Sequence, residues 1–322
     1  MTTGKPAEWP ALPYQEWAET KKTLHMFAQI LGKTRLAMSP PQPEWLGTCL
    51  FFNSRGLTTG PMPWGTAAVE LTLDLYDDEL RVSSSAGRQD SISLFPPRCV
   101  ADVFGEVKRL LSDHGIDAEL WSKPQEVADA VPLDEDQRNC AYVPEQARNW
   151  LRVNTALANV FEEWRSRFFG RTGLQFWWGA FDLAVLRFTG KHAAPPTDRG
   201  YIMRYDLDAE FMNAGFWPGD DTFPVPIIYA YIYPQPPGCE RETIRPSQAG
   251  WVPEMGEWTL PYEDARASGD PSQMILDFLD SVYGVAGLRG GWDLKQFEYE
   301  IPTPPRRSCA SSHGKRPATP RP

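Results

Sequence analysis

Four stretches of the chain repeat apolar residues at the three- and four-residue spacing of an amphipathic helix. These predicted helices cover residues 14–38, 100–114, 144–169 and 271–286. Pro144 and Pro271 suit the first turn of a helix, where no backbone N–H is needed, and Gly115 suits a C-terminal cap. The pattern therefore predicts four long helices.

Between the helices, apolar and polar residues alternate with the period of two that is typical of strands. The predicted strands cover residues 45–53, 67–76, 80–84, 91–94, 118–121, 203–209, 225–233 and 258–260. Short polar turns separate several of them, which indicates antiparallel hairpins with one polar face. The segment AGFWPGDD at 214–221 is predicted to be irregular because of its Gly and Pro content.

The longest apolar run, LQFWWGAFDLAVLRFTG, lies at residues 174–190. Both of its faces are apolar at a period of two, so it predicts one strand that is buried on both sides. Asp182 lies near its middle, and Arg187 falls on the opposite face because the spacing between them is odd. An unpaired buried carboxylate costs roughly several kcal/mol, so Asp182 needs a partner, a proton or contact with water.

The order of the elements predicts an α+β protein in which antiparallel sheets are covered by about four long helices. Helix, strands and helix occur in that order twice, which suggests two similar α-β-α halves, 8–121 and 144–302, within one compact unit over 8–302. Residues 122–143 would form the crossover, and no residue-level repeat supports a duplication. The last segment, 303–322, is basic and rich in Pro and Ser, and we expect it to be disordered.

Composition changes this picture mainly through charge. The chain has 322 residues, of which 42% are apolar and 12% aromatic, with thirteen Trp, enough for a large aromatic-rich core. Its net charge is −10, and residues 1–302 alone carry −15, because the tail holds five basic residues and no acid. A body of this charge repels phosphate, which argues against nucleic acid and anionic membranes as partners. No apolar run reaches the ~18 residues of a spanning helix.

Motifs for metals and cofactors are absent from the sequence. The five Cys are scattered without a CxxC pair, so neither a zinc ribbon nor a dense disulfide framework is predicted. The four His lack HxH or HxxxH spacing, and no GxGxxG or phosphate-loop motif occurs, so we expect no metal and no cofactor. The N-terminus lacks the basic and apolar segments of a signal peptide. A reduced, cytoplasmic location is expected.

Asp182 is the first candidate for a functional residue. In an apolar setting its pKa would be raised, which suits a catalytic general base or a carboxylate that orients a ligand. The alternative is a structural acid that accepts bonds from backbone amides at a bulge near Gly179 or pairs with a core arginine. Trp178 and Arg187, on the same run, are further ligand-binding candidates.

A polar stripe on the first predicted helix is the second candidate. His25, Gln29 and Lys33 recur every four residues beside the apolar stripe, so their side chains share one helix face. They could converge on an anionic group or a carbonyl, with His25 as a catalytic candidate. The alternative is a solvent-facing stripe next to a buried one.

The aromatic segments after residue 209 are the third candidate. Trp217 and Tyr231, with acids nearby, could line a cleft for a sugar, an aromatic or a cationic ligand. Glu210 could act with Asp182 as a second catalytic carboxylate. The alternative is ordinary core packing with rigid loop ends.

Six strings of the sequence resemble the bacterial family catalogued as domain of unknown function 5996. They are TLHMFAQILGKTRLAMSPP (23–41), RGLTTGPMPWG (55–65), FWWGAFDLAVLRFTG (176–190), NAGFWPG (213–219), AYIYPQPPG (230–238) and LPYEDAR (260–266). The resemblance covers residues 8–300 and leaves out the basic tail. It implies a single soluble bacterial unit, and it brings no activity, cofactor or catalytic residue with it.

The sequence leaves two functions open. One is a small-molecule-binding or enzymatic pocket, acidic and aromatic, near Asp182. The other is a non-catalytic protein-interaction or structural module, in which the basic tail would act as a flexible contact. The sequence decides neither the ligand nor the oligomeric state.

Overall fold

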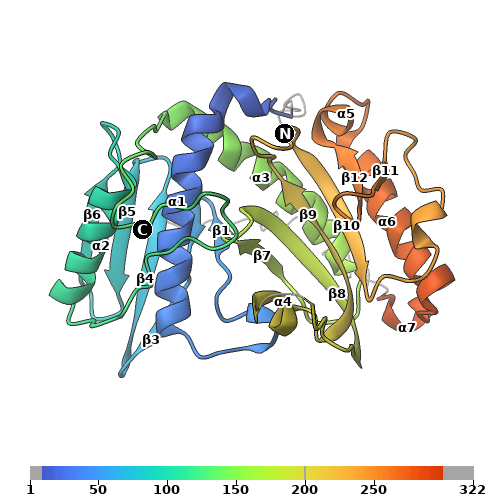
Figure 1. Ribbon diagram of the computed structural model, residues 1–322, viewed down its shortest axis with the longest axis horizontal. Helices are drawn as coiled ribbons and strands as arrows, with labels where there is room; N and C mark the ends of the chain where they lie inside the picture. Colours follow the sequence, from blue (N-terminus) through green and yellow to red (C-terminus); the bar gives the residue numbers. More distant parts are fainter. Residues whose placement is uncertain (1–8, 199–200, 300–322) are drawn as a thin grey trace, which may run out of the picture.

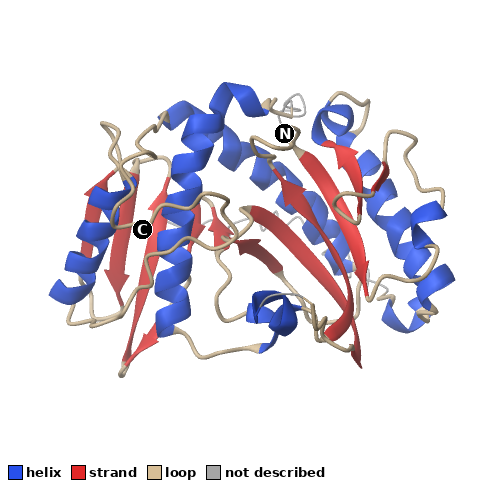
Figure 2. Cartoon of the chain, viewed as in Figure 1, coloured by secondary structure: helices blue, strands red, loops and turns tan. Residues whose placement is uncertain are grey.

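The computed structural model describes residues 9–198 and 201–299, in which two antiparallel sheets pack with four long helices (Figures 1 and 2). The long helices are α1 (Tyr14–Met38), α2 (Val100–Asp113), α3 (Pro144–Ser166) and α6 (Pro271–Gly290). The predicted α+β class and all four predicted helices are confirmed. The short elements are α4 (Tyr201–Asp206), α5 (Tyr262–Arg266), α7 (Leu294–Phe297) and the 3-10 turns η1 (Pro43–Trp45) and η2 (Cys239–Arg241).

The first sheet is built from strands that follow one another along the chain. They are β1 (Phe51–Asn53), β2 (Gly56–Thr58), β3 (Met62–Trp64), β4 (Ala67–Asp74), β5 (Glu79–Ser84) and β6 (Gln89–Ser93). Their order is β1-β2-β4-β5-β6, and β3 pairs with β4. Val69, Leu71 and Leu73 of β4 are fully buried, as the alternation predicted, and α1 and α2 pack against this sheet.

The second sheet has the order β11-β12-β10-β9-β8-β7. Its strands are β7 (Leu174–Trp177), β8 (Asp182–His192), β9 (Ala209–Trp217), β10 (Ile227–Tyr233), β11 (Gly250–Val252) and β12 (Glu257–Pro261). Helices α3 and α6 pack against this sheet, and Arg187 marks the covered face because its guanidinium lies over the rings of Trp164 and Tyr283. The opposite face carries Asp182.

The two sheets meet at their edges, at the junction of β1 and β7 near the centre of Figure 1. Leu50 and Phe176 exchange both backbone hydrogen bonds there, with N···O distances of 2.9 and 2.8 Å. Helix α1 runs beside this junction, and every residue from Thr23 to Thr34 is buried. A helix buried on all sides needs no polar face toward water. The prediction of a single apolar stripe on α1 is therefore wrong.

Several predictions about strands are also wrong. Of the predicted strand 45–53, only Phe51–Asn53 forms a strand. Residues 174–190 form two strands of a hairpin, because the chain turns at 178–181. Residues 118–121 form no strand, and 203–209 are mostly helix α4. The segment predicted to be irregular contributes Ala214–Trp217 to β9, since sheet pairing on both sides overrides its Gly content.

The crossover at 122–143 contains no helix or strand but is held in place. Leu133 is fully buried, and Asp136 accepts hydrogen bonds from the backbone N–H groups of Arg138 and Asn139 at 3.0 Å. A disulfide joins Cys140 to Cys99 at the start of α2, a pairing that the scattered cysteines did not predict. The expected cytoplasmic location stays a prediction.

No helix in the described residues is long and apolar enough to cross a membrane. The order helix, six strands, helix occurs twice, as α1–β1 to β6–α2 and as α3–β7 to β12–α6 with short helices inserted. Similarity of the two halves beyond this order stays a prediction. The basic segment 303–322 lies outside the described residues.

Candidate ligand-binding site

The face of the second sheet that points away from α3 and α6 gathers most of the unusual polar side chains. We call it the Asp182 face. In Figure 1 it is turned toward the viewer, with α3 behind the sheet and α4 in front of β8. Strand register assigns it these polar, aromatic and small residues: Gln175, Trp177, Asp182, Ala184, Asn213, Gly215, Trp217, Tyr229, Tyr231, Glu257 and Thr259. The apolar Leu186, Phe188, Phe211 and Ile227 share the face, and Leu186 and Phe211 pack there with Leu207.

A strained turn places Asp182 on this face. Phe181 has a φ of +67°, a conformation that is unfavourable for a bulky side chain. Its N–H donates to the carbonyl of Trp177 at 2.8 Å, and its ring stacks on Trp150 with centroids 5.0 Å apart. The turn changes the phase of the alternation, so Phe176 faces the helices while Asp182 does not. In the single strand predicted for 174–190, a period of two would place both on one face, so that arrangement is wrong.

Asp182 is 6% exposed and accepts a hydrogen bond from the hydroxyl of Tyr229. Burial raises the pKa of Asp182 to about 7, against the lowering effect of the Tyr229 bond. Gly215 makes this pair possible, because a Cβ at that position would overlap the carbonyl oxygen of Leu183 and the hydroxyl of Tyr229. The carboxyl group therefore changes charge near neutral pH.

Four further carboxyl groups from other elements lie near this pair or near one another. Burial raises the pKa of Glu257 (β12) to about 8 and that of Asp206 (α4) to about 7. Burial likewise raises the pKa of Glu126, in the crossover, and brings that of Glu44, in η1, to about 8. Asp182 and Glu126 also repel each other, as do Glu44 and Asp206.

In the described part of the chain, these carboxyl groups lack cationic partners. Within residues 9–198 and 201–299, no Lys or Arg forms an ion pair with Asp182, Glu257, Asp206, Glu126 or Glu44. They are not grouped tightly enough to bind a metal, because the same residues contain no metal-ligating cluster. The arrangement resembles a binding surface for a diffuse positive charge more than a metal centre.

Two amide side chains on the Asp182 face have oxygens without partners. Gln175 and Asn213 are 8% and 7% exposed, and neither Gln175 Oε1 nor Asn213 Oδ1 has a hydrogen-bond donor. The amide nitrogen of Asn213 donates to the hydroxyl of Tyr231 at 3.1 Å. Buried polar atoms are normally paired, so each orphan marks a position where a bound molecule could supply a donor.

The His25, Gln29 and Lys33 stripe is buried, at 8%, 0% and 2% exposed. The solvent-facing alternative is therefore wrong. The side chains converge on carbonyl groups of the chain itself: those of Trp178 and Gly179 for His25, of Trp178 and Gln125 for Gln29, and of Lys123 for Lys33. Burial lowers the pKa of His25 to about 3, so the imidazole is neutral and its Nε2–H donates to the carbonyls. The stripe fixes the β7–β8 turn and the crossover to α1.

The remaining sequence candidates are spread over other places. Arg187 lies between α3 and α6, with its guanidinium carbon 3.4 Å from the ring centre of Trp164. Glu210 binds Thr189 at 2.6 Å and Lys191 at 3.3 Å, and register places it on the opposite face from Asp182, so the two carboxylates do not act together. Trp178 packs against Gly32, and its Nε1 donates to the carbonyl of Thr48 at 2.9 Å.

Asp182, Trp217 and Tyr231 thus lie on the same face of the second sheet, while Glu210 and Arg187 lie elsewhere. The sequence pattern did not identify Tyr229 as the partner of Asp182, and it gave no indication of Gln175, Asn213, Glu257, Asp206, Glu126 and Glu44. Alternation within YAYIY and NAG was a usable signal, because Tyr229 and Tyr231, like Asn213 and Gly215, share a face at a period of two. The four distant acids had no signal, since four separate elements supply them.

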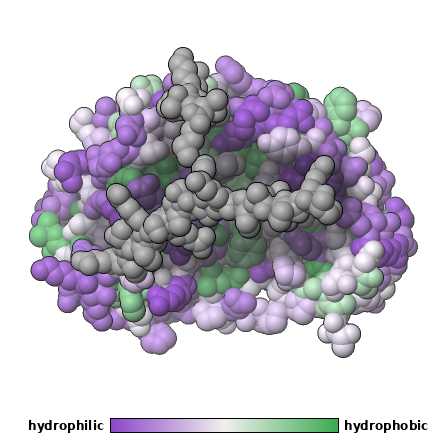
Figure 3. All heavy atoms as spheres, turned by 180° about the vertical axis from the view of Figure 1, so that it is seen from behind, coloured by the Kyte–Doolittle hydropathy of each residue, from purple (hydrophilic) through white to green (hydrophobic). Residues whose placement is uncertain are grey.

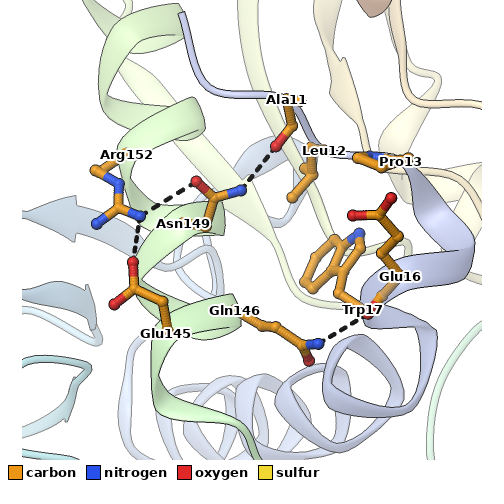
Figure 4. Close-up of a pocket in the computed structure, with 9 residues that line it drawn as sticks. All are labelled: Ala11, Leu12, Pro13, Glu16, Trp17, Glu145, Gln146, Asn149 and Arg152. Carbon is orange, nitrogen blue, oxygen red and sulfur yellow. Dashed lines mark hydrogen bonds and ion pairs between the residues drawn. The ribbon is translucent and has the colours of Figure 1, made fainter.

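Two surface hollows lie away from the Asp182 face. One, of about 300 Å³, lies between the N-terminal arm, α1 and α3, and Figure 4 shows Asn149 and Gln146 bonded to the backbone of the arm and α1 at its wall. The other, of about 400 Å³, is lined by residues such as Met38, Trp64 and Glu119. Neither contains a candidate residue from the sequence.

Comparison with family models decides the relationship of the chain. The model described as "Family of unknown function (DUF5996)" matches residues 9–299. The chain belongs to DUF5996. Neither curated proteins nor solved structures give a match. Membership of DUF5996 therefore covers both sheets and all the described helices, and the chemistry of the Asp182 face has to be argued from its own residues.

Proposed function

We propose that this DUF5996 protein binds a small organic molecule on the Asp182 face, near α4 and Glu126 of the crossover. The observation that carries the proposal is the pair of buried, unpartnered amide oxygens of Gln175 and Asn213 on the same face as Asp182. Leaving one buried polar group unpaired costs ~1–3 kcal/mol. A ligand that pairs both atoms would recover that free energy on binding.

The same geometry suits proton transfer. A carboxyl group whose pKa is about 7 exists in both forms at neutral pH, which is the condition for efficient general acid–base chemistry. The Tyr229 hydroxyl keeps the carboxyl of Asp182 in one orientation. If the bound molecule is transformed, Asp182 is the residue that would take or give the proton. Tyr231 lies two residues after Tyr229 on β10, on the same face of the sheet.

The alternative of a protein-interaction module has less support. The large exposed apolar side chains in the described residues, such as Phe95, Trp121 and Leu288, come from separate elements. Where atoms other than the grey ones are visible in Figure 3, hydrophobic residues show as small groups among hydrophilic ones. Interaction surfaces usually present a larger continuous apolar patch.

A thermal-shift screen of the full chain against neutral, anionic and cationic metabolites tests the proposal. At least one compound should raise the melting temperature by several degrees when present at about 100 times its Kd. Calorimetry should then show a loss of at least tenfold in affinity for Asp182→Asn and for Asn213→Leu. The exposed Asp264 provides the matched control, and Asp264→Asn should bind like the wild type.

Two results would contradict the proposal. One is a screen in which no compound of any charge class binds. The other is a set of hits whose affinity is the same in the wild type, in Asp182→Asn and in Asn213→Leu, because such compounds would bind elsewhere. Two variants are used so that a folding defect in one of them does not decide the outcome.

A further inference from the structure

We infer that the ligand of the Asp182 face is an organic cation, with a primary ammonium or guanidinium group attached to an apolar or aromatic body. The inference rests on the proposed function and adds the class of the ligand. It follows from the charges near the Asp182 face, from the kind of atom left unpartnered there and from the aromatic side chains beside them.

In the described residues, the charged groups near the Asp182 face are mostly acidic. The acids come from β8 (Asp182), β12 (Glu257), α4 (Asp206), the crossover (Glu126) and η1 (Glu44). On α1, the nearest titratable groups are His25, which is neutral, and Lys21, which lies over the ring of Phe181 and is attracted by Asp220 and Asp221. Asp208 adds a further negative charge beside α4. Like charges that repel one another without a cation are stabilised by any positive group that enters.

In the described residues, the unpartnered buried side-chain atoms on the Asp182 face and on η1 are hydrogen-bond acceptors. They are Gln175 Oε1, Asn213 Oδ1 and, on η1 at 5% exposed, Glu44 Oε2. In their ionised form, the carboxyl groups add only acceptors to this set. A molecule that satisfies the site must therefore bring several donors. Ammonium and guanidinium groups bring three and five donors together with the positive charge, whereas an anion would bring none.

The aromatic side chains supply the second half of the recognition. The rings of Tyr229 and Tyr231 are stacked at 6.5 Å between centroids with planes 16° apart, and Trp177 and Trp217 share their face of the sheet. Aromatic faces attract cations and also pack against an apolar body. The chain uses the same contact internally, where Lys33 lies 4.8 Å from the ring centre of Trp121.

Matched probes test the charge directly. We would titrate the full chain with benzylammonium and benzamidinium, with their neutral counterparts benzyl alcohol and benzamide, and with benzoate. Isothermal titration calorimetry at pH 8 should show each cation binding at least tenfold more tightly than its neutral counterpart, and no binding of benzoate. Asp182→Asn and the partly exposed Glu257→Gln should each weaken cation binding about tenfold or more, while Asp264→Asn should not.

The pH dependence of the affinity provides a second test, because an acid with only a structural role would not change it. Because the free protein keeps part of its protons on Asp182, Asp206 and Glu257 near neutral pH, a bound cation should displace them. The affinity for benzylammonium should therefore rise about tenfold or more from pH 6 to pH 8. Titrations in buffers of different ionisation enthalpy should show proton release, which Asp182→Asn reduces.

The outcomes separate the two proposals. If neutral or anionic compounds bind as tightly as the cations and still depend on Asp182 and Asn213, the binding site stands and the inference about a cation is overturned. A cation affinity that is independent of pH would overturn the same inference. If no compound of any class depends on these residues, the proposed function itself fails.

Discussion

At the scale of single residues, the most informative group is the carboxyl of Asp182, which folding transfers from water into the protein interior. Asp182 combines 6% exposure, a hydrogen bond from Tyr229 and repulsion by Glu126. Each of these facts belongs to the folded state alone. The pKa of the side chain therefore differs between the folded and unfolded chain, and this difference has a measurable consequence for stability.

Stability should fall as pH rises from about 4 to about 7. The folded protein holds the Asp182 proton up to a pH near 7, whereas the unfolded chain releases it near 3.8, so the folded state binds more protons in this window. One such group changes the free energy of unfolding by up to ~1.4 kcal/mol per pH unit. Urea unfolding at several pH values should show this slope, and Asp182→Asn should reduce it. Parallel curves for wild type and variant would refute the assignment.

Gly215→Ala should destabilise the protein by about 1–3 kcal/mol, the usual cost of overpacking a core. The added methyl group would overlap the Leu183 carbonyl and the Tyr229 hydroxyl, and it would also displace Tyr229 from Asp182. Gly250→Ala is the matched control, because β11 leaves open space at that position. Denaturant unfolding measures both, and equal midpoints would show that the sheet yields at Gly215 without cost.

At the scale of elements, α1 shows how a helix can organise irregular segments. Its polar stripe supplies donors to backbone carbonyls of the β7–β8 turn and of the crossover, neither of which is part of a helix or strand at that point. Gln29 makes the largest number of these bonds, because its amide oxygen also accepts a hydrogen bond from the backbone N–H of Gln125 at 2.9 Å. Irregular backbone can be buried only if its polar groups are paired, and α1 provides that pairing.

Gln29→Leu should cost roughly 2–5 kcal/mol, since it leaves the backbone C=O and N–H of Gln125 without their partner at ~1–3 kcal/mol each, while His25 still donates to the Trp178 carbonyl. Hydrogen exchange should rise at residue 125 and in the 178–181 turn before it rises in the strands. Gln15→Leu makes the same chemical change at an exposed position of the same helix, and it should leave stability and exchange unchanged. Protection that is unaltered in Gln29→Leu would count against the role given to α1.

At the scale of the whole molecule, one core and one covalent link tie the two sheets and the crossover together. Buried apolar residues from both sheets belong to the same continuous cluster. The Cys99–Cys140 disulfide closes a loop with a sequence separation of 41 between α2 and the end of the crossover. A loop of this length restricts the unfolded chain considerably.

Reduction of the disulfide should lower the free energy of unfolding by about 4 kcal/mol in the chain-entropy estimate. Urea unfolding with and without a thiol reductant measures the difference. The double variant Cys99→Ser, Cys140→Ser serves as the control, because the reductant should then have no effect on it. An identical midpoint for the wild type in both conditions would show that the link contributes nothing to stability.

The sequence by itself determined the class of the fold, the four long helices and most strands, and it singled out Asp182. Those features follow from local periodicity, from Pro and Gly positions and from the cost of burying a charge, all of which can be read within a few residues. Only the tertiary structure decided the rest. The strained turn at Phe181 reversed which residues accompany Asp182, and sheet pairing made a strand of Asn213 to Trp217 despite Gly215.

The composition of the site also belongs to tertiary structure. Glu44, Glu126, Asp206 and Glu257 are far apart in the chain and have no shared spacing, so no pattern could group them with Asp182. Their raised pKa values come from desolvation and mutual repulsion, which arise only when separate elements pack. The sequence identified Asp182 as an acid that needed a partner. The fold supplies the hydroxyl of Tyr229 and brings four more acids to this part of the molecule. In the described residues, no cation forms an ion pair with Asp182.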